Sequence, residues 1–362
     1  MIFWYNKYYS KRMLKGVFFC MSAGKKVKLG QFFTTGSEWL KPQIRDFIIA
    51  SGCTIAYDPF AGEGHLLDIS PAYGIKITKG LDIDNSLGWD INDSLKNIPT
   101  VEKAIIITNP PYLAKQSATR KKIDLSEYFN SSAYDDLYLI ALDKMLDAQK
   151  YVVAIIPESF INSSFKRKHL LYSITILEDN PFNDTDAPVC VVCFDGVEKD
   201  FKDIKVYKNG SFENNLKTLE SIRLKPKRHV KMSFNNLNGW LGIRAVDMTD
   251  DNTFITFDFK ENFKYDWGKR IKESSRHYTL VDIEIEPDRR QAFIDKCNEI
   301  LTYVRVKSAD TILTPFMGNT KKGVRRRRLD FKLARSIMEK SHDYVYNKSL
   351  KEYESIDLFN LE

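Results

Sequence analysis

The residues best suited to chemistry form the short segment Asn109-Pro110-Pro111-Tyr112, which follows the apolar run 105–108. Two successive prolines prevent the backbone from continuing as a paired strand or starting a helix at once. The side-chain oxygen of Asn109 and the carbonyl of Pro110 can both accept hydrogen bonds from one planar amino group, while Tyr112 supplies a flat face. The exocyclic amine of a nucleobase fits this arrangement. The plain alternative is a tight turn after a strand.

A second chemical segment runs from Asp58 to Gly64 and follows the strand-like residues 53–57. Ala61 and Gly62 precede Gly64, and helix-like residues come directly after it. The two glycines lack the Cβ atoms that would keep a ligand away from the backbone, and the start of the next helix offers N–H groups. This order of strand, glycine turn and helix indicates a nucleotide-like ligand.

A third candidate is Asp82, at the end of the strand-like residues 75–81. In doubly wound folds an acid at this place meets the ribose hydroxyls of such a ligand. A helix-capping or solvated acid is the alternative interpretation of a single aspartate.

These segments belong to an alternation of strands and helices that predicts an α/β fold with an open parallel sheet. In such a sheet the strand order reverses beside the first strand, so the loops after Tyr57 and Thr108 should be neighbours. The glycine turn and Asn109 would then share one pocket. Further along, the pattern predicts a helix over 131–150, a strand over 151–156, a helix over 158–168, and strands over 173–177 and 189–194.

Composition limits the class of protein. The chain has 362 residues, of which 43% are hydrophobic and 28% charged, as in soluble globular proteins with one large or two ordinary domains. The cysteines are five and scattered, which favours reduced thiols, and neither they nor the five histidines show metal-ligand spacing. No apolar run approaches the roughly 20 residues needed to cross a bilayer. We therefore expect a cytoplasmic protein that uses no metal.

The chain divides into three expected regions. Residues 1–24 form an N-terminal tail outside the fold, since Met21 offers a second start and the apolar part of the tail is too short for a secretory signal. Residues 25–198 carry the alternating strands and helices. Residues 199–362 change to short mixed segments rich in basic, asparagine and aromatic residues.

The last region contains several basic clusters, and the net charge of the whole chain is +7. The densest cluster is Arg325-Arg326-Arg327-Arg328, preceded by two lysines at 321–322. A single charge run is usually a solvated face, but several clusters in one region favour the binding of phosphates.

Together these motifs resemble the gamma class of amino-methyltransferases that act on adenine in DNA, within the Rossmann-like S-adenosylmethionine-dependent enzymes. Residues 30–35, Gly-Gln-Phe-Phe-Thr-Thr, look like the leading cofactor motif of this class, with Thr35 where a proline is usual. Residues 58–64 match its glycine turn and residues 109–112 match its catalytic motif. Phe182 matches a later aromatic residue that packs on the extruded base.

The resemblance, which covers residues 28–195, implies a class I methyltransferase domain with a mostly parallel, seven-stranded sheet and a C-terminal mixed α/β target-recognition domain. It implies S-adenosylmethionine as cofactor and double-stranded DNA as substrate, with a flipped-out adenine methylated at N6. Tyr112 and Phe182 would stack on that base, and Arg325–Arg328 would contact the DNA. The residues expected to bind the cofactor are Thr34, Asp58, Ala61, Gly62, Gly64, Asp82 and Asp93.

Two further expectations come from the same resemblance. Either Asp90 or Asp93 meets the adenine amino group of the cofactor, and we prefer Asp93 because it follows the strand end directly. The enzyme would act as a monomer and as the modification half of a restriction-modification system, with any endonuclease a separate protein.

Rival functions fit parts of this pattern. Enzymes that methylate a protein glutamine amide carry the same motif, but they resemble shorter chains with an N-terminal helical domain. Methylation of cytosine N4 usually goes with serine in place of Asn109. A DNA-binding module that keeps a cofactor pocket without turnover is a rival of another class, and the intact motif argues against it.

Overall fold

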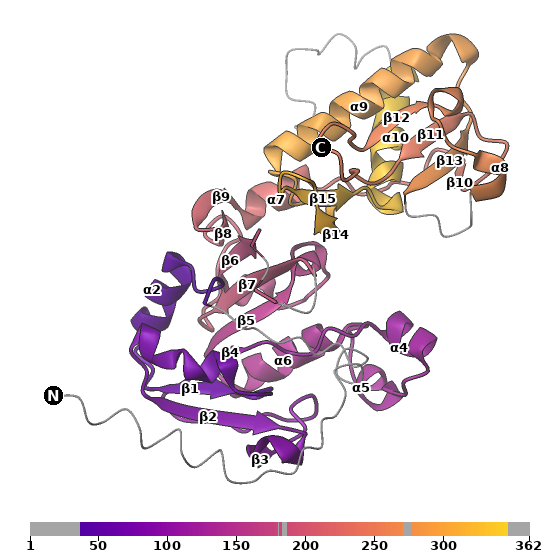
Figure 1. Ribbon diagram of the computed structural model, residues 1–362. Helices are drawn as coiled ribbons and strands as arrows, with labels where there is room; N and C mark the ends of the chain where they lie inside the picture. Colours follow the sequence, from indigo (N-terminus) through magenta and orange to yellow (C-terminus); the bar gives the residue numbers. More distant parts are fainter. Residues whose placement is uncertain (1–36, 180, 183–186, 271–276, 347–362) are drawn as a thin grey trace.

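The structure is a computed structural model that describes residues 37–179, 181–182, 187–270 and 277–346. The expected tail, the leading cofactor motif and Thr34 lie outside these described residues. Figure 1 shows two units that follow each other along the chain, the first drawn in indigo to magenta and the second in orange to yellow. Within the described ranges no helix has the length and apolar character needed to cross a membrane.

The first unit is built on a nine-stranded sheet. Its strands are β1 Ile55–Asp58, β2 Ile77–Asp82, β3 Asp90–Ile91, β4 Ala104–Thr108, β5 Tyr151–Pro157, β6 Leu171–Leu177, β7 Val189–Phe194, β8 Lys205–Lys208 and β9 Ser211–Asn215. They lie in the order β3-β2-β1-β4-β5-β7-β6-β8-β9. The first five in this order are parallel, whereas β7 runs antiparallel to both of its neighbours.

The mostly parallel character expected from the sequence is confirmed, but the count of seven strands is wrong. The sheet has nine strands because β8 pairs with β6 in parallel and β9 pairs with β8 in antiparallel fashion. Both added strands lie beyond residue 198, so the sheet continues past the predicted boundary between the two regions.

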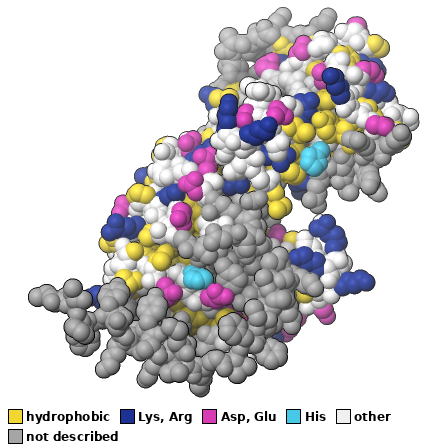
Figure 2. All heavy atoms as spheres, in the orientation of Figure 1, with side chains coloured by type: hydrophobic (Ala, Val, Ile, Leu, Met, Phe, Trp, Pro, Cys, Tyr) yellow, Lys and Arg dark blue, Asp and Glu magenta, His cyan; other side chains and the backbone are white. Residues whose placement is uncertain are grey.

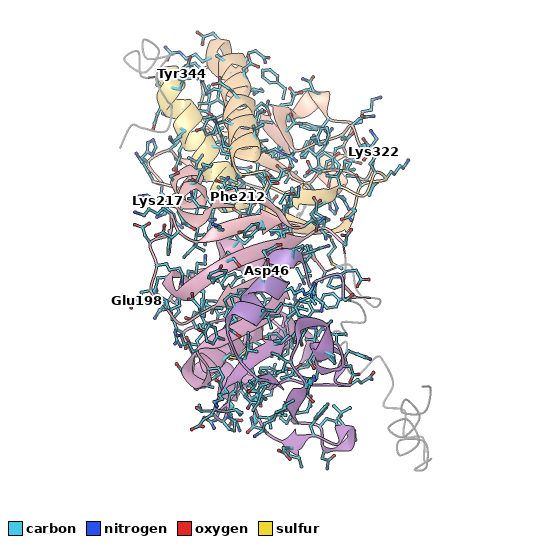
Figure 3. All side chains as sticks on the ribbon, turned by 90° about the vertical axis from the view of Figure 1, so that its left-hand side faces the viewer. Asp46, Glu198, Phe212, Lys217, Lys322 and Tyr344 are labelled. Carbon is cyan, nitrogen blue, oxygen red and sulfur yellow. The ribbon has the colours of Figure 1, made fainter. Side chains whose placement is uncertain are left out.

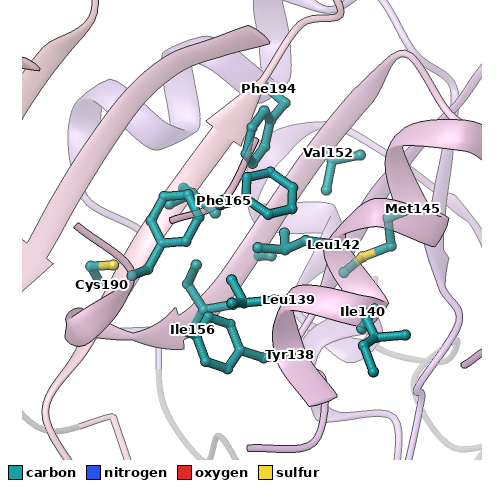
Figure 4. Close-up of a cluster of buried hydrophobic side chains, with 14 of the residues drawn as sticks. Tyr138, Leu139, Ile140, Leu142, Met145, Val152, Ile156, Phe165, Cys190 and Phe194 are labelled. Atoms are coloured by element: carbon teal, nitrogen blue, oxygen red, sulfur yellow. The ribbon is translucent and has the colours of Figure 1, made fainter. Parts of the chain in front are cut away.

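Helices cover both faces of this sheet, which is why β4 is buried along its whole length. On one face α6 (Leu137–Ala148) packs against Ile106 and its neighbours, in the core drawn in Figure 4. On the other face α2 (Pro42–Ala50) and α3 (His65–Asp68) pack against Ile105 and Ile107. Successive side chains of β4 point to opposite faces of the sheet, so this strand contributes to both apolar cores.

Two helices differ from the sequence prediction. The helix expected over 131–150 is shorter, since α5 (Ser126–Asn130) and a turn precede α6. The helix expected over 158–168 is replaced by two short 3-10 helices, η3 (Glu158–Asn162) and η4 (Lys168–Leu170). Polar side chains of this segment form hydrogen bonds that do not belong to an α-helix. The Asn162 amide donates to carbonyls of the second unit, and the Lys168 ammonium donates to the Ile161 and Ser163 carbonyls.

The second unit has its own apolar core around a four-stranded antiparallel sheet of order β10-β13-β11-β12. Helices α9 and α10 pack on this sheet, and β14 and β15 form a separate hairpin. The elements are α7 Leu216–Ile222, β10 Met232–Phe234, β11 Leu241–Arg244, β12 Thr256–Phe259, α8 Trp267–Arg270, β13 Tyr278–Ile283, α9 Arg290–Lys307, β14 Thr314–Asn319, β15 Arg325–Arg328 and α10 Phe331–Tyr346.

The two units meet where η3, directly after β5, contacts the β14–β15 hairpin. Glu158 and Arg327 form an ion pair there, with side chains that are 1% and 2% exposed. The Arg223 guanidinium donates to the Asn162 side-chain oxygen at 2.5 Å. Polar contacts from one short segment therefore connect the sheet to the second unit.

Candidate active site

The carboxyl ends of β1, β2 and β4 meet at one edge of the sheet, because β1 pairs in parallel with both neighbours. A pocket of about 200 Å³ opens at this edge. Gly62, from the loop after β1, and Asn109, from the loop after β4, both line the pocket, together with Asp82 and Asp93. The expected adjacency of the two loops is therefore confirmed.

The glycine turn is held by its own backbone and by Asp82. The Ala61 N–H donates to a carbonyl at the end of β2 at 2.9 Å, and the Gly62 N–H donates to the Asp82 carboxylate at 2.8 Å. Gly64 has a φ of 87° and precedes α3 directly. An alanine Cβ at Gly64 would lie 2.8 Å from the Trp89 ring, so both the conformation and the space require glycine.

Trp89 supports this turn, although the sequence analysis did not identify it. Its indole N–H donates to the Gly62 carbonyl at 2.8 Å. Its ring lies so close to Gly64 and Gly80 that a Cβ at Gly80 would come within 2.5 Å of it. Trp89 therefore packs across two glycine positions, a relation that tertiary packing creates and sequence spacing does not indicate.

Asp58 joins the ends of β1 and β4 through a buried hydrogen bond. Its carboxyl group is 2% exposed and accepts from the Thr108 hydroxyl at 2.5 Å and from the Phe60 N–H at 2.9 Å. Burial raises the pKa of Asp58 to about 7, against the opposing effect of these donors. Asp58 is therefore a pocket carboxyl group that titrates near neutral pH.

Asp82 shapes the pocket before any ligand enters it. One of its carboxylate oxygens accepts the Gly62 N–H at 2.8 Å and the other accepts the Asp84 N–H at 2.9 Å. Each oxygen has a second lone pair, to which a hydroxyl group of a bound ligand could donate a hydrogen bond. Asp82 is thus both a brace of the glycine turn and an acceptor.

The structure separates Asp93 from Asp90. Asp93 lines the pocket, and its carboxylate accepts the Tyr128 hydroxyl at 3.0 Å while lying 3.5 Å from the Lys96 ammonium. Asp90 is exposed on β3 and is not among the pocket residues. Tyr128 comes from α5, which the sequence analysis had placed in no site.

Asn109 and Tyr112 are hydrogen-bonded to each other, and the Tyr112 hydroxyl also lies 2.8 Å from the Ile155 carbonyl of β5. The Tyr112 hydroxyl donates to the Asn109 side-chain oxygen, so this oxygen faces Tyr112 and keeps a second lone pair that a ligand donor can use. Burial raises the pKa of Tyr112 well above its ordinary value, which keeps the hydroxyl neutral.

Pro110 and Pro111 directly follow Asn109 in the chain. Pro110 is buried, and Pro111 lines the pocket beside Asn109. Neither proline has a backbone N–H, so neither can donate to a carbonyl of this segment.

Phe182 lies next to Tyr112, as the resemblance implied for two residues that share one base. The ring centroids are 6.4 Å apart and the rings are inclined by 66°. A base stacked between two rings needs them parallel and about 7 Å apart, twice the ~3.5 Å contact distance. Phe182 is also 5% exposed, so it fills the place beside Tyr112 and must shift before a base can stack on it.

The arginine run of β15 alternates between interior and surface. Arg325 and Arg327 are 6% and 1% exposed, whereas Arg326 and Arg328 are half-buried. Arg327 does not fit the expected contact with DNA, because its guanidinium is paired with Glu158 in the interior. The two lysines of the hairpin turn, at 321–322, are exposed, and Figure 3 shows Lys322 projecting from the ribbon.

Tertiary structure also brings together His229, His342 and Asp343, whose ligand atoms lie within 4.8 Å of one another. The closest contact joins His229 Nε2 to the Asp343 carboxylate at 2.7 Å. Burial, and after it the charge of the nearby Lys227, lowers the pKa of Lys340 beside this cluster. These two lysines oppose a divalent metal, so we interpret the cluster as a hydrogen-bonded contact between a loop and α10.

Comparison with known proteins gives a partial match. Residues 94–185 match the family described as Eco57I restriction-modification methylase. The matched segment is about a quarter of the chain, and it contains both Asn109–Tyr112 and Phe182. This segment therefore has the sequence pattern of restriction-modification methylases. No curated protein matches the chain.

Solved structures resemble the chain only distantly. They include the type I restriction-modification methyltransferase subunit from Streptococcus thermophilus (16% identity, TM-score 0.34, 49% of this chain and 47% of that one). The type I restriction enzyme EcoKI M protein is 15% identical with a TM-score of 0.34 over 49% of this chain and 48% of that one. TrmN from Thermus thermophilus is 16% identical with a TM-score of 0.27 over 43% of this chain and 49% of that one. The chain thus spans about half the length of these proteins, and scores this low assign no function.

Proposed function

We propose that the protein is a DNA methyltransferase of the restriction-modification type that transfers a methyl group from S-adenosylmethionine to N6 of adenine. The observation that carries the proposal is the shared pocket of Gly62 and Asn109. It brings a turn suited to a nucleotide-like cofactor beside an acceptor suited to a planar amine. The family match of residues 94–185 supports the same interpretation.

The described residues fit the cofactor. The glycine turn lets a ligand approach the backbone, and Asp82 offers acceptors for ribose hydroxyls. Asp93, oriented by Tyr128, would accept from the adenine amino group. Asp58 places a carboxyl group in the pocket, where it would attract a positively charged cofactor. When bound, S-adenosylmethionine supplies a sulfonium methyl group that an amine nitrogen can take.

The target adenine would lie over Tyr112. Asn109, through its side-chain oxygen, and Pro110, through its carbonyl, would accept the two N6 hydrogens and draw the nitrogen lone pair out of ring conjugation. Held in this way, the nitrogen would face the methyl group that the cofactor supplies, and the proton that it loses after transfer would go to water. Catalysis by this chain would consist mainly of orientation.

Extraction of the base from the duplex costs about a few kcal/mol. Stacking on an aromatic ring returns roughly 1–3 kcal/mol per base. Tyr112 supplies one such face, and Phe182 supplies a second after the shift that its burial requires. The bound state therefore needs a local rearrangement beside Asn109.

Double-stranded DNA is the proposed substrate, and the second unit is the proposed target-recognition domain. We propose a monomer that acts separately from any endonuclease. The exposed lysines of the hairpin turn, at 321–322, support contact with phosphates, while Arg326 and Arg328 offer half-buried cations beside them. Protein glutamine amides present an equally planar amine and form the alternative substrate class.

The test is transfer of tritiated methyl from S-adenosylmethionine to duplex DNA, with a glutamine-containing protein substrate in parallel. Asn109→Ala should abolish transfer and leave cofactor affinity nearly unchanged, because the pocket is otherwise intact. Asn214→Ala, at the opposite end of the sheet on β9, is the matched control and should keep full activity. Transfer by Asn109→Ala, or label in the protein substrate alone, would refute the proposal.

A further inference from the structure

A basic helix follows the Asn109–Tyr112 segment directly. Helix α4 (Lys115–Lys121) begins three residues after Tyr112, and Lys122 caps its C-terminal end. Its exposed cations are Lys115, Arg120, Lys121 and Lys122, and no acidic residue occurs from 115 to 122. We call these four side chains the α4 basic surface. Figure 2 shows dark blue side chains gathered on this lobe, which Figure 1 places apart from the sheet.

The root of this helix is fixed to the body of the first unit. The Lys115 N–H donates to the Asp135 carbonyl at 2.8 Å, and Ala114 forms a bridge with Asp136. Ala118 is 3% exposed and belongs to the main core. The basic surface is therefore held at a constant position relative to Asn109, although its charges face solvent.

Lys115 and Arg120 have a weak and an uncharged partner, respectively. Lys115 lies 3.7 Å from the carboxylate of Asp135, and both side chains are at least half exposed, so the pair is weak. Arg120 donates to the Ser117 hydroxyl, which is uncharged. Arg120, Lys121 and Lys122 are consecutive and exposed, so the cations of α4 gather at its C-terminal end.

The size of the surface fits one strand of DNA. A helix of seven residues is about 10 Å long. Each strand of a duplex carries one negative charge for about every 3.4 Å of axis, so the helix spans about three phosphates. We infer that the α4 basic surface binds the backbone phosphates of the strand whose base lies at Asn109. This inference rests on the proposed function, because it takes the substrate to be DNA.

A substitution at Lys122 can distinguish a role of this residue in the fold from a role in DNA binding. Lys122 has a φ of 55°, a left-handed conformation that is strained for a residue other than glycine. Lys122→Gly removes this strain together with one cation. If Lys122 served the fold alone, the variant would be more stable and bind DNA equally well. We expect a more stable protein that binds DNA more weakly.

The main experiment measures the affinity of the full chain for a mixed-sequence duplex as a function of salt. Three cations are replaced together in Arg120→Gln/Lys121→Gln/Lys122→Gln. The slope of log affinity against log salt should fall by about 0.9 for each phosphate that the variant no longer neutralises, and so by about 2.7 for all three. The matched control, Lys202→Gln/Lys205→Gln/Lys217→Gln, removes the same charge near β8 and α7 and should leave the slope unchanged.

The outcomes distinguish this inference from the proposed function. An unchanged slope in the α4 variant, or an equal fall in the control, overturns the inference while methyl transfer by the parent protein still supports the proposed function. A parent protein that neither binds the duplex nor methylates it overturns both. A fall confined to the α4 variant, with unchanged cofactor affinity and reduced DNA affinity of Lys122→Gly, supports the inference.

Discussion

Arg327→Met should destabilise the protein by about 3–5 kcal/mol, because it leaves a buried carboxylate without its counter-charge. The side chains of Glu158 and Arg327 are 1% and 2% exposed, so water cannot take the place of the missing guanidinium. The second carboxylate oxygen of Glu158 accepts no hydrogen bond among the described residues, so no existing donor compensates. The ion pair also lies between the two units, where its removal acts on both.

The double variant Glu158→Leu/Arg327→Met tests whether the cost is that of an isolated charge. Removing both charges leaves an apolar contact, which is often neutral or stabilising relative to a buried ion pair. We therefore expect the double variant to be more stable than either single variant. A coupling of this sign is what a double-mutant cycle measures.

Urea unfolding of the full chain, followed by circular dichroism and tryptophan fluorescence, gives these free energies for each transition. Asp147→Asn is the control, since the Arg167–Asp147 pair spans 2.7 Å with side chains 26% and 65% exposed and should contribute less than about 1 kcal/mol. The reasoning fails if Arg327→Met costs no more than this control, or if the double variant costs the sum of the two single ones.

Four further predictions concern the pocket. Cofactor affinity should rise as pH increases through about 7, because ionised Asp58 attracts the positive cofactor, and Asp58→Asn should flatten this profile in calorimetric titrations. Without ligand, the raised pKa of Asp58 means that the free energy of unfolding falls as pH rises from about 4 to 7 in the parent but not in Asp58→Asn. Gly64→Ala should clash with Trp89 and weaken cofactor binding at least tenfold, which corresponds to about 1.4 kcal/mol of binding free energy. Adding Trp89→Leu to this variant should restore part of the cofactor affinity. Asp93→Asn should reduce cofactor affinity, whereas an equal reduction in exposed Asp90→Asn would contradict the assignment.

Local patterns were sufficient for the fold class and for the meeting of the two loops. The apolar runs predicted strands such as β4, and the topology of open sheets then placed the residues after β1 and β4 side by side. These inferences succeed because each depends on neighbouring residues and on a rule that limits strand order. The strand count failed because it was taken from the resemblance, and edge strands such as β8 are too short to reveal themselves in the sequence pattern.

The arginine run shows where interpreting a charge cluster from sequence reaches its limit. Four consecutive cations suggest a surface, but a strand alternates its side chains, so β15 turns Arg325 and Arg327 inward. Inward placement is tolerable for Arg327 because Glu158, 169 residues away along the chain, pairs with it. Nothing local to either residue indicates that partner.

The sequence by itself determined the chemical groups of the pocket and the order in which they occur, since residue type and short-range spacing decide hydrogen-bonding capacity and backbone shape. Tertiary structure alone decided which groups meet: Trp89 with the glycine turn, Tyr128 with Asp93, and Tyr112 with the β5 backbone. The reason is physical. These contacts arise from packing between segments distant along the chain, and packing depends on the whole arrangement of elements rather than on any one of them.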